Sequence, residues 1–229
     1  MNMEINNETL GETIEKVICD IAQIDSSMII HRTNPVLEQC IKPLLEEVCR
    51  RLPRIVRHVG TERGQRGGQS KSTIDFYCEN GESISVKSNK NSNFKVCPSE
   101  CGQPGTDTFD RYFGHLYEGK INYQKFKMVC LQKSHDMMPI YLEHLFDCDY
   151  FVWIYIGESK QFHIIRKKDI PSFVWEKEKF SFSRDINNWN ESCTVYYDSV
   201  IIGEYQAHQH RNCYKFRFNI LHLCNILGV

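Results

Sequence analysis

The fold of this chain is decided by an alternating stretch, Gln69-Ser70-Lys71-Ser72-Thr73-Ile74-Asp75-Phe76-Tyr77-Cys78-Glu79-Asn80-Gly81-Glu82-Ser83-Ile84-Ser85-Val86-Lys87. Before Asn80-Gly81, three apolar residues alternate with Thr73, Asp75 and Tyr77. After it, Ile84 and Val86 alternate with serine and lysine. A period of two is typical of half-buried strands. The stretch therefore predicts a β-hairpin.

The length of the turn decides which residues of the hairpin face each other. A two-residue Asn80-Gly81 loop would set Asp75 opposite Val86 and put an acid on the apolar face. A three-residue loop, Glu79-Asn80-Gly81, closes as a bulge with Gly81 in the left-handed conformation. It gives the pairs Phe76–Ile84, Ile74–Val86, Asp75–Ser85 and Thr73–Lys87. Only this register separates apolar from polar side chains. We therefore expect the three-residue loop, with Asp75 and Lys87 on the wet face.

This arrangement of acid and lysine has a known counterpart. Ile74-Asp75 followed by Ser85-Val86-Lys87 resembles the motif of the PD-(D/E)xK nuclease superfamily. The longer run from Gly68 through Lys71 and Asp75 to Lys87-Ser88-Asn89-Lys90 looks like that of a type II restriction endonuclease. The sequence departs from the motif at Ser85, where the family usually has Glu or Asp. The resemblance implies an α/β fold, with a central mixed β-sheet flanked by helices on both faces and the catalytic hairpin at its middle.

The resemblance also implies a Mg²⁺-dependent catalytic site. Phosphodiester hydrolysis needs a metal that withdraws charge and activates water, and Mg²⁺ needs only one or two carboxylates. We expect Asp75, the Val86 carbonyl and Glu15 to bind the metal, with Glu12 as the alternative to Glu15. Lys87 would orient or help to deprotonate the attacking water. Ser85 would hold a metal-bound water. The alternative is an ordinary surface salt bridge between Asp75 and Lys87.

Composition limits the class of protein. At 229 residues, one endonuclease domain over 1–229 is expected. No stretch approaches the roughly 18 apolar residues of a membrane span, and the N-terminus shows no secretory signal, so we expect no membrane and a cytoplasmic protein. The 11 cysteines are an odd number, which weighs against a disulfide framework. Most of them lie in apolar patterns as small hydrophobic residues.

The distribution of charge favours DNA as the partner, although the formal net charge is only −1. Between Arg50 and Lys71 stand seven basic residues and one acid, Glu62, which suits a phosphate backbone. We expect recognition mainly in 88–104 and 194–218. The candidate DNA-binding residues are Arg63, Arg66, Lys71, Asn89, Lys90, Asn91, Gln206, His208, His210, Arg211 and Asn212. The glycine-rich segment 60–70 could equally be a plain connector.

Periodicity predicts further elements around the hairpin. Helices are expected over 8–24, from Asn34-Pro35 to Leu52 with a kink or split at Pro43, from 106 to about 117, and over 139–146. Strands are expected over 55–59, 126–131, 150–156, 162–165, 194–205 with a break near Gly203, and 213–218. Cys97, Cys101, His208, His210 and Cys213 could alternatively supply a zinc site.

The sequence therefore predicts a Mg²⁺-dependent type II restriction endonuclease that cuts double-stranded DNA at a short specific site. A homodimer is expected because its symmetry would match a palindrome. A repair nuclease or junction resolvase is the alternative within the superfamily. A catalytically inactive DNA-binding protein would equally account for Ser85.

Overall fold

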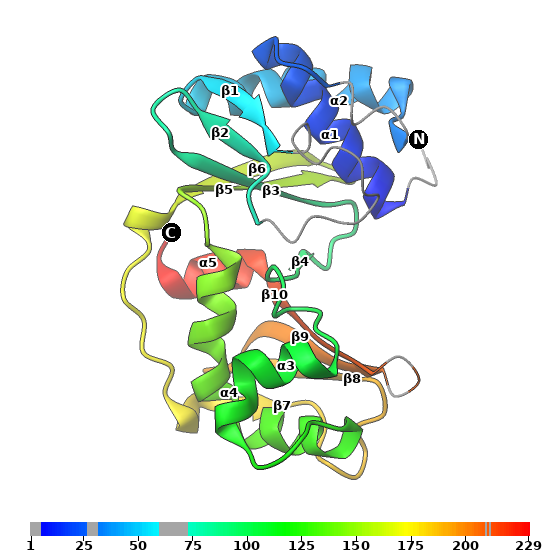
Figure 1. The fold of residues 1–229 in the computed structure, drawn as a ribbon, viewed down its shortest axis with the longest axis vertical. Helices are drawn as coiled ribbons and strands as arrows, with labels where there is room; N and C mark the ends of the chain where they lie inside the picture. The colour runs from blue at the N-terminus through cyan, green and yellow to red at the C-terminus, as the bar shows by residue number, and fades with distance from the viewer. Residues whose placement is uncertain (1–5, 27–31, 60–72, 209, 211) are drawn as a thin grey trace. The chain divides into compact units, whose positions relative to one another are not determined.

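The computed structural model describes residues 6–26, 32–59, 73–208, 210 and 212–229. The chain divides into two compact units, each with its own sheet (Figure 1). Unit 1 comprises Met1–Ser92 and Cys148–Asp169, and unit 2 comprises Asn93–Asp147 and Ile170–Val229. The predicted α/β class with a mixed sheet and helices is confirmed, but the described residues form two sheets instead of the single central sheet that was expected. That the two units together act as one endonuclease domain stays a prediction.

Unit 1 contains a mixed five-stranded sheet, called sheet A here, in the order β1-β2-β3-β5-β6. Its strands are β1 (Ile55–His58), β2 (Phe76–Cys78), β3 (Ser83–Asn89), β5 (Tyr150–Ile156) and β6 (Lys160–Arg166). All neighbours are antiparallel except β3 and β5, which run parallel. Strand β5 is buried along nearly its whole length, as a run of large apolar residues predicts for a central strand.

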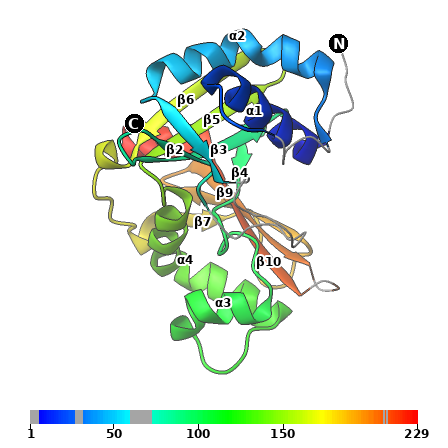
Figure 2. The same ribbon diagram turned by 45° about the horizontal axis from the view of Figure 1, so that its top comes forward.

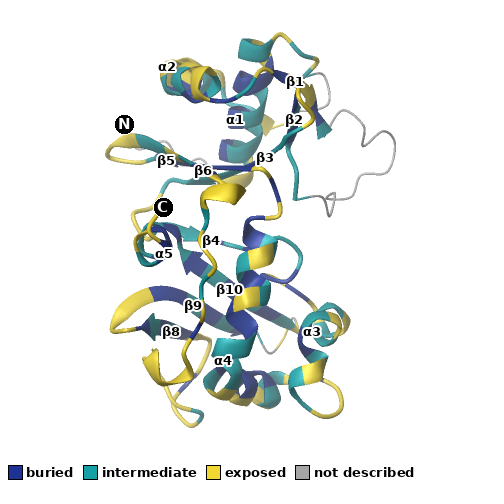
Figure 3. Cartoon of the chain, turned by 90° about the vertical axis from the view of Figure 1, so that its left-hand side faces the viewer, coloured by how far each residue is buried: buried dark blue, intermediate teal, exposed yellow. Residues whose placement is uncertain are grey.

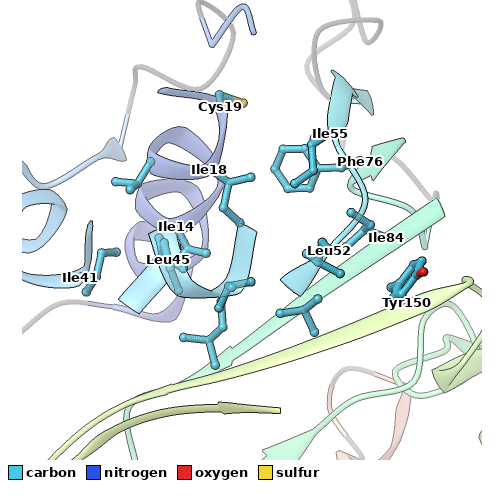
Figure 4. Packing of buried hydrophobic residues seen from close by; sticks show 14 of the residues in the cluster. Ile14, Ile18, Cys19, Ile41, Leu45, Leu52, Ile55, Phe76, Ile84 and Tyr150 are labelled. Atoms are coloured by element: carbon cyan, nitrogen blue, oxygen red, sulfur yellow. The ribbon is translucent and has the colours of Figure 1, made fainter. Parts of the chain in front are cut away.

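Two helices cover one face of sheet A, α1 (Asn7–Ala22) and α2 (Pro35–Arg51) (Figure 2). Each begins at an asparagine cap, Asn6 or Asn34, whose side chain accepts a hydrogen bond from a first-turn amide. Their apolar stripes pack on the sheet, as Figure 4 shows for Ile14, Ile41 and Ile84. Pro43 lies inside α2, which is one continuous helix. Of the two outcomes predicted at this proline, a kink or a split, the split does not occur.

A polar clip joins the beginnings of β3 and β5. The Asp149 carboxylate accepts hydrogen bonds from the Ser83 backbone N–H at 2.8 Å and from the Ser83 hydroxyl at 2.7 Å. These bonds lower the pKa of Asp149. The clip lies directly before the first pair of the parallel ladder, Ile84 with Tyr150. It therefore fixes the register of the strand that carries Ser85 and Lys87.

Unit 2 contains an antiparallel sheet, called sheet B, in the order β4-β10-β9-β8-β7. Its strands are β4 (Lys95–Val96), β7 (Phe180–Phe182), β8 (Ser192–Tyr197), β9 (Val200–His208) and β10 (Cys213–Asn219). Its helices are α3 (Thr106–Phe113), α4 (Tyr123–Leu145) and α5 (Ile220–Leu227). Short 3₁₀ turns cover Gly114–Leu116, Lys167–Asp169 and Lys177–Lys179, the second of them in unit 1.

An aromatic core holds the helices of unit 2 to sheet B. Phe109 of α3 and Phe126 of α4 pack edge to face on Tyr214 and Tyr205, respectively. Tyr141 of α4 stacks on Phe216 of β10 at 4.6 Å between ring centroids. Rings in these arrangements add stabilisation beyond their buried area. The buried colouring of α4, β9 and β10 in Figure 3 follows this core.

Two element predictions in unit 2 are wrong. Residues 126–131 are part of the helix α4, not a strand. The predicted helix over 139–146 is confirmed as the C-terminal part of α4, which is kinked at Lys133. Buried residues follow helical spacing on both sides of this kink, among them Phe126, Cys130, Met137 and Tyr141. In 194–205 the break falls at Asp198-Ser199, both with positive φ, and not near Gly203. Within the described part of the chain, no helix combines the length and apolar character needed to cross a membrane.

Candidate active site

The turn of the β2–β3 hairpin has three residues, as predicted. Gly81 has φ of 86°, a left-handed conformation that favours glycine. Its N–H donates to the Cys78 carbonyl at 2.9 Å, and the Cys78 N–H donates to the Glu82 carbonyl at 2.8 Å. Asn80 accepts a further hydrogen bond from the Glu82 N–H at 3.1 Å. These contacts are those of a bulged three-residue loop.

The register is confirmed for the part of the hairpin that forms a ladder. Phe76 pairs with Ile84 and Tyr77 with Ser83, so Phe76 and Ile84 enter the core together. The ladder ends at Phe76. The expected pairs Asp75–Ser85, Ile74–Val86 and Thr73–Lys87 are therefore not part of it, and the Asp75 N–H instead donates to the Ile84 carbonyl at 2.8 Å. Asp75 therefore lies directly before the first residue of β2.

Asp75 is fixed by backbone groups of both neighbouring strands. Its Oδ2 accepts a hydrogen bond from the Val86 N–H at 2.6 Å, and its carbonyl accepts one from the Val59 N–H at 2.9 Å. Burial raises the pKa of Asp75 to about 6, the nearby charge of Lys87 opposes that rise, and the charge of Glu15 adds to it. An acid with a perturbed pKa beside a lysine and a second acid is a candidate functional group.

Lys87 lies on β3 opposite Trp153 of β5 and is half-buried. In the described residues no ion pair joins Lys87 to Asp75, although its charge acts on the Asp75 carboxylate. The ordinary salt bridge considered above is therefore not formed. An amine close to an acid but not bonded to it is available for a third group that carries negative charge.

Ser85 shows that the expectation of a solvent-exposed polar face on the hairpin is wrong at this position. Its side chain is 1% exposed, so this face is not wet at Ser85. Its Oγ is buried and has no hydrogen-bond partner among the described residues. Unsatisfied buried hydroxyls are uncommon and indicate a bound water, an ion or a functional role. The Cys148 thiol lies next to the Ser85 backbone, and burial raises the pKa of that thiol to about 12.

Glu15 reaches the site from helix α1. Its Oε2 lies 2.9 Å from Nε2 of His58, the last residue of β1, and His58 is 3% exposed. The Glu15 charge also acts on Asp75, which places the two carboxylates in one electrostatic environment. Of the two candidate glutamates, Glu15 is the one that the described contacts tie to the site. Its role as a metal ligand stays a prediction.

The donor set suits a hard cation. Asp75 and Glu15 supply carboxylate oxygens, and Ser85 supplies an orphaned buried hydroxyl, which together fit the one or two carboxylates and retained waters that Mg²⁺ prefers. Within the described residues, no group of three or more His, Cys, Asp or Glu could hold a metal. The zinc alternative is therefore not supported by Cys97, Cys101, His208, His210 and Cys213.

The predicted DNA-binding residues fall into both units. In unit 1, the Asn89 side chain accepts a hydrogen bond from the Trp153 indole at 2.7 Å and is anchored to the sheet. Lys90 and Asn91 follow in a bend, and Asn91 is exposed. Arg63, Arg66 and Lys71 lie outside the described residues, as does Arg211 in unit 2.

In unit 2, the remaining candidates lie on or beside the β9–β10 hairpin. Gln206 and His208 alternate with buried residues along β9, and Lys215 and Arg217 do so along β10. These four side chains form a polar side of the hairpin, while His210 and Asn212 are exposed in its loop. Whether any of these residues binds DNA stays a prediction.

Glu204 organises that polar side and was missed at the sequence level. Its carboxylate accepts from Lys95 at 2.7 Å, from Gln206 at 2.6 Å and from Arg217 at 3.1 Å. Gln206 is therefore already engaged by a neighbour. His58 was also missed, since only the contact with Glu15, 43 positions away, distinguishes it from an ordinary strand residue.

Sequence comparison finds one relative of this chain among the restriction enzymes. The chain is similar to a type II restriction enzyme, the class that the motif of acid and lysine suggests. That relative is the type II restriction enzyme CviAII of Paramecium bursaria Chlorella virus 1, 27% identical over 149 residues. The match covers 63% of this chain and 41% of the relative's length. No model of a known protein family matches the chain, and no solved structure does so at a significant level.

Proposed function

We propose that this protein is a Mg²⁺-dependent type II restriction endonuclease that hydrolyses double-stranded DNA at a short specific sequence. The observation that carries the proposal is the environment of Asp75. Its carboxylate is held by the Val86 N–H, and both Lys87 and Glu15 act on its charge. The similarity to a restriction enzyme supports the same reaction class.

Asp75, Glu15 and the Val86 carbonyl are the proposed metal ligands, and Ser85 Oγ is proposed to hold a water of the metal. When bound, Mg²⁺ would supply charge withdrawal from the phosphate and a more acidic water. Asp75 must be ionised to bind a cation, and with its pKa near 6 in the free protein it is ionised at neutral pH. The Val86 N–H fixes the direction in which its second oxygen points.

Lys87 has the proposed role of a charge-stabilising and water-orienting residue. Its amine is close to Asp75 without a direct ion pair, so it can approach a phosphate oxygen that binds beside Asp75. A positioned cation of this kind stabilises negative charge that develops in the transition state. The backbone pairing of Lys87 with Trp153 of the parallel strand β5 fixes the position from which the Lys87 side chain extends.

The test is digestion of plasmid and phage DNA with the purified protein in Mg²⁺ or in EDTA. The expected result is discrete bands in Mg²⁺ and none in EDTA, with sequenced ends giving the recognition site. Asp75→Asn and Lys87→Ala should each reduce the cleavage rate at least 100-fold. Glu79→Gln is the matched control, because Glu79 is an exposed acid of the same hairpin, and it should cut normally. Full activity in Asp75→Asn would overturn the proposal.

One observation favours a second candidate, a DNA-binding protein that does not cut. Ser85 stands where the related motif has an acid, and its buried neutral hydroxyl does not supply the charge of that acid. Retained binding to specific DNA with no Mg²⁺-dependent cutting would support this candidate. Cutting confined to branched or damaged DNA would instead support a repair nuclease or resolvase. Sedimentation with and without cognate DNA tests the proposed homodimer.

A further inference from the structure

The end of strand β1 contacts both acidic residues of the candidate site. Its last residue, His58, contacts the Glu15 carboxylate at 2.9 Å. The next residue, Val59, donates its N–H to the Asp75 carbonyl at 2.9 Å. Two consecutive residues therefore hold the side chain of one acid and the backbone of the other.

His58 is itself rigidly placed. It is 3% exposed, it pairs with Phe76 in the β1–β2 ladder, and its ring centroid lies 4.9 Å from that of Phe76. Phe76 directly follows Asp75 and is fully buried. The imidazole thus sits at a fixed position relative to Asp75, whereas a glutamate on a helix surface would otherwise sample several rotamers.

Electrostatics alone would separate Glu15 from Asp75, because like charges repel. The hydrogen bond between His58 and the Glu15 carboxylate, at 2.9 Å, holds Glu15 in place against this repulsion. Two acids kept together in this way are prearranged for a cation, and Ser85 leaves the site one acid short.

We propose that His58 is a positioning residue that holds Glu15 at the divalent-metal site, where Glu15 takes the place of the acid missing at Ser85. The inference rests on the proposed function. It extends the proposed function by assigning a role to His58, a residue that contacts no substrate. Partners of this kind, which orient metal ligands, typically change metal affinity by about 10- to 100-fold when removed.

The test measures binding of Mn²⁺, a paramagnetic substitute for Mg²⁺, by electron paramagnetic resonance of the full chain without DNA. His58→Phe keeps a buried ring but removes the donor, and it should weaken Mn²⁺ binding about tenfold. His58→Gln, whose amide nitrogen can replace Nε2, should restore binding to within about threefold of wild type. Glu15→Gln should weaken binding as much as His58→Phe, and combining the two should add little, because they remove one interaction.

Two matched controls accompany these variants. His163→Phe alters an exposed histidine of β6 and Glu46→Gln alters an exposed glutamate of α2. Both should bind Mn²⁺ as the wild type does. Unchanged binding in Glu15→Gln or His58→Phe overturns the inference, as does equal loss in His58→Phe and His58→Gln, which would indicate packing alone. If His58→Phe does not fold, Glu15→Gln and His58→Gln still decide between these outcomes.

Asp75→Asn separates this inference from the proposed function. If Asp75→Asn loses Mn²⁺ while all His58 and Glu15 variants retain it, the metal site stands and only the role of His58 is wrong. If Asp75→Asn also retains Mn²⁺ at wild-type affinity, the proposed metal site itself is wrong.

Discussion

Asp75 is half-buried and its carboxylate accepts a fixed hydrogen bond from the Val86 N–H, which has a consequence for stability. Its pKa is about 6 in the folded protein and about 3.9 in an unfolded chain. The folded state therefore binds the proton more tightly, and the stabilisation from this group is fully present below pH 4. It is lost as the pH rises from about 4 to 6.

We predict that Asp75→Asn raises the free energy of unfolding by about 1–3 kcal/mol at pH 7 in EDTA. The difference from wild type should vanish below about pH 4, where both side chains are neutral. Urea unfolding followed by circular dichroism at several pH values measures this. An equal difference at pH 3.5 and pH 7 would contradict the assigned burial. Added Mg²⁺ should stabilise the wild type more than the variant.

Ser85 permits a comparison of two serines on one strand. Its unpartnered buried Oγ carries a desolvation cost without a compensating bond. Ser85→Ala should therefore raise the free energy of unfolding in EDTA by about 0.5–1 kcal/mol, while it lowers the cleavage rate. Ser83→Ala is the control, since Ser83 donates to Asp149 at 2.7 Å, and it should lower the free energy of unfolding by about 1 kcal/mol. A destabilised Ser85→Ala would point to a bond that its hydroxyl makes.

At the scale of elements, the three-residue turn sets the hairpin. A side chain added at Gly81 would meet no atom within 4 Å, so the cost of a substitution comes from its φ of 86° alone. Gly81→Ala should lower the free energy of unfolding by about 1–2 kcal/mol, and Gly81→Asn by less, because asparagine tolerates this conformation. Chemical denaturation measures both. Equal costs for the two would show that something other than the backbone conformation is responsible.

The sequence correctly predicted those elements whose periodicity, turn and capping residues all lie within one continuous segment. The hairpin follows from alternation and a glycine turn, and α1 and α2 from apolar spacing with asparagine caps. The first part of helix α4 was predicted wrongly because the apolar run 126–131 also suits a strand. Buried Lys127 and Ser134 interrupt its stripe, and they are tolerated because Trp189 and Tyr205 bond to them from distant parts of the chain.

The residues of the candidate site also divide into those that one segment predicts and those that depend on contacts between distant segments. Asp75 and Lys87 were found because they belong to a single hairpin. His58 and Glu204 were not, because their roles depend on contacts between distant segments. The burial of Ser85 and the end of the ladder at Phe76 likewise depend on the packing of neighbouring elements, which no local alternation encodes.

At the scale of the whole molecule, the proposed cutting residues and the candidate DNA-binding residues of the β9–β10 hairpin lie in different units. Lys87 belongs to unit 1, and the polar side of β9–β10 belongs to unit 2. We predict that Lys87→Ala abolishes cleavage but changes cognate DNA affinity less than about threefold. Lys215→Ala should weaken binding and reduce the salt slope by about 1, with the cleavage rate at saturating DNA retained. Fluorescence anisotropy across salt concentrations and single-turnover cleavage measure these quantities. Loss of cleavage at saturation in Lys215→Ala would contradict the separation.

The parallel pairing of β3 with β5 also governs when the protein can work during its synthesis. Ser83 and Asp149 are 66 positions apart, and most of the residues between them belong to the other unit. Until the ribosome has released β5, β3 has an open edge on the side that β5 later occupies, and pairing across so long a segment is slow. A nascent chain therefore carries Asp75 and Lys87 well before it has the scaffold that aligns them.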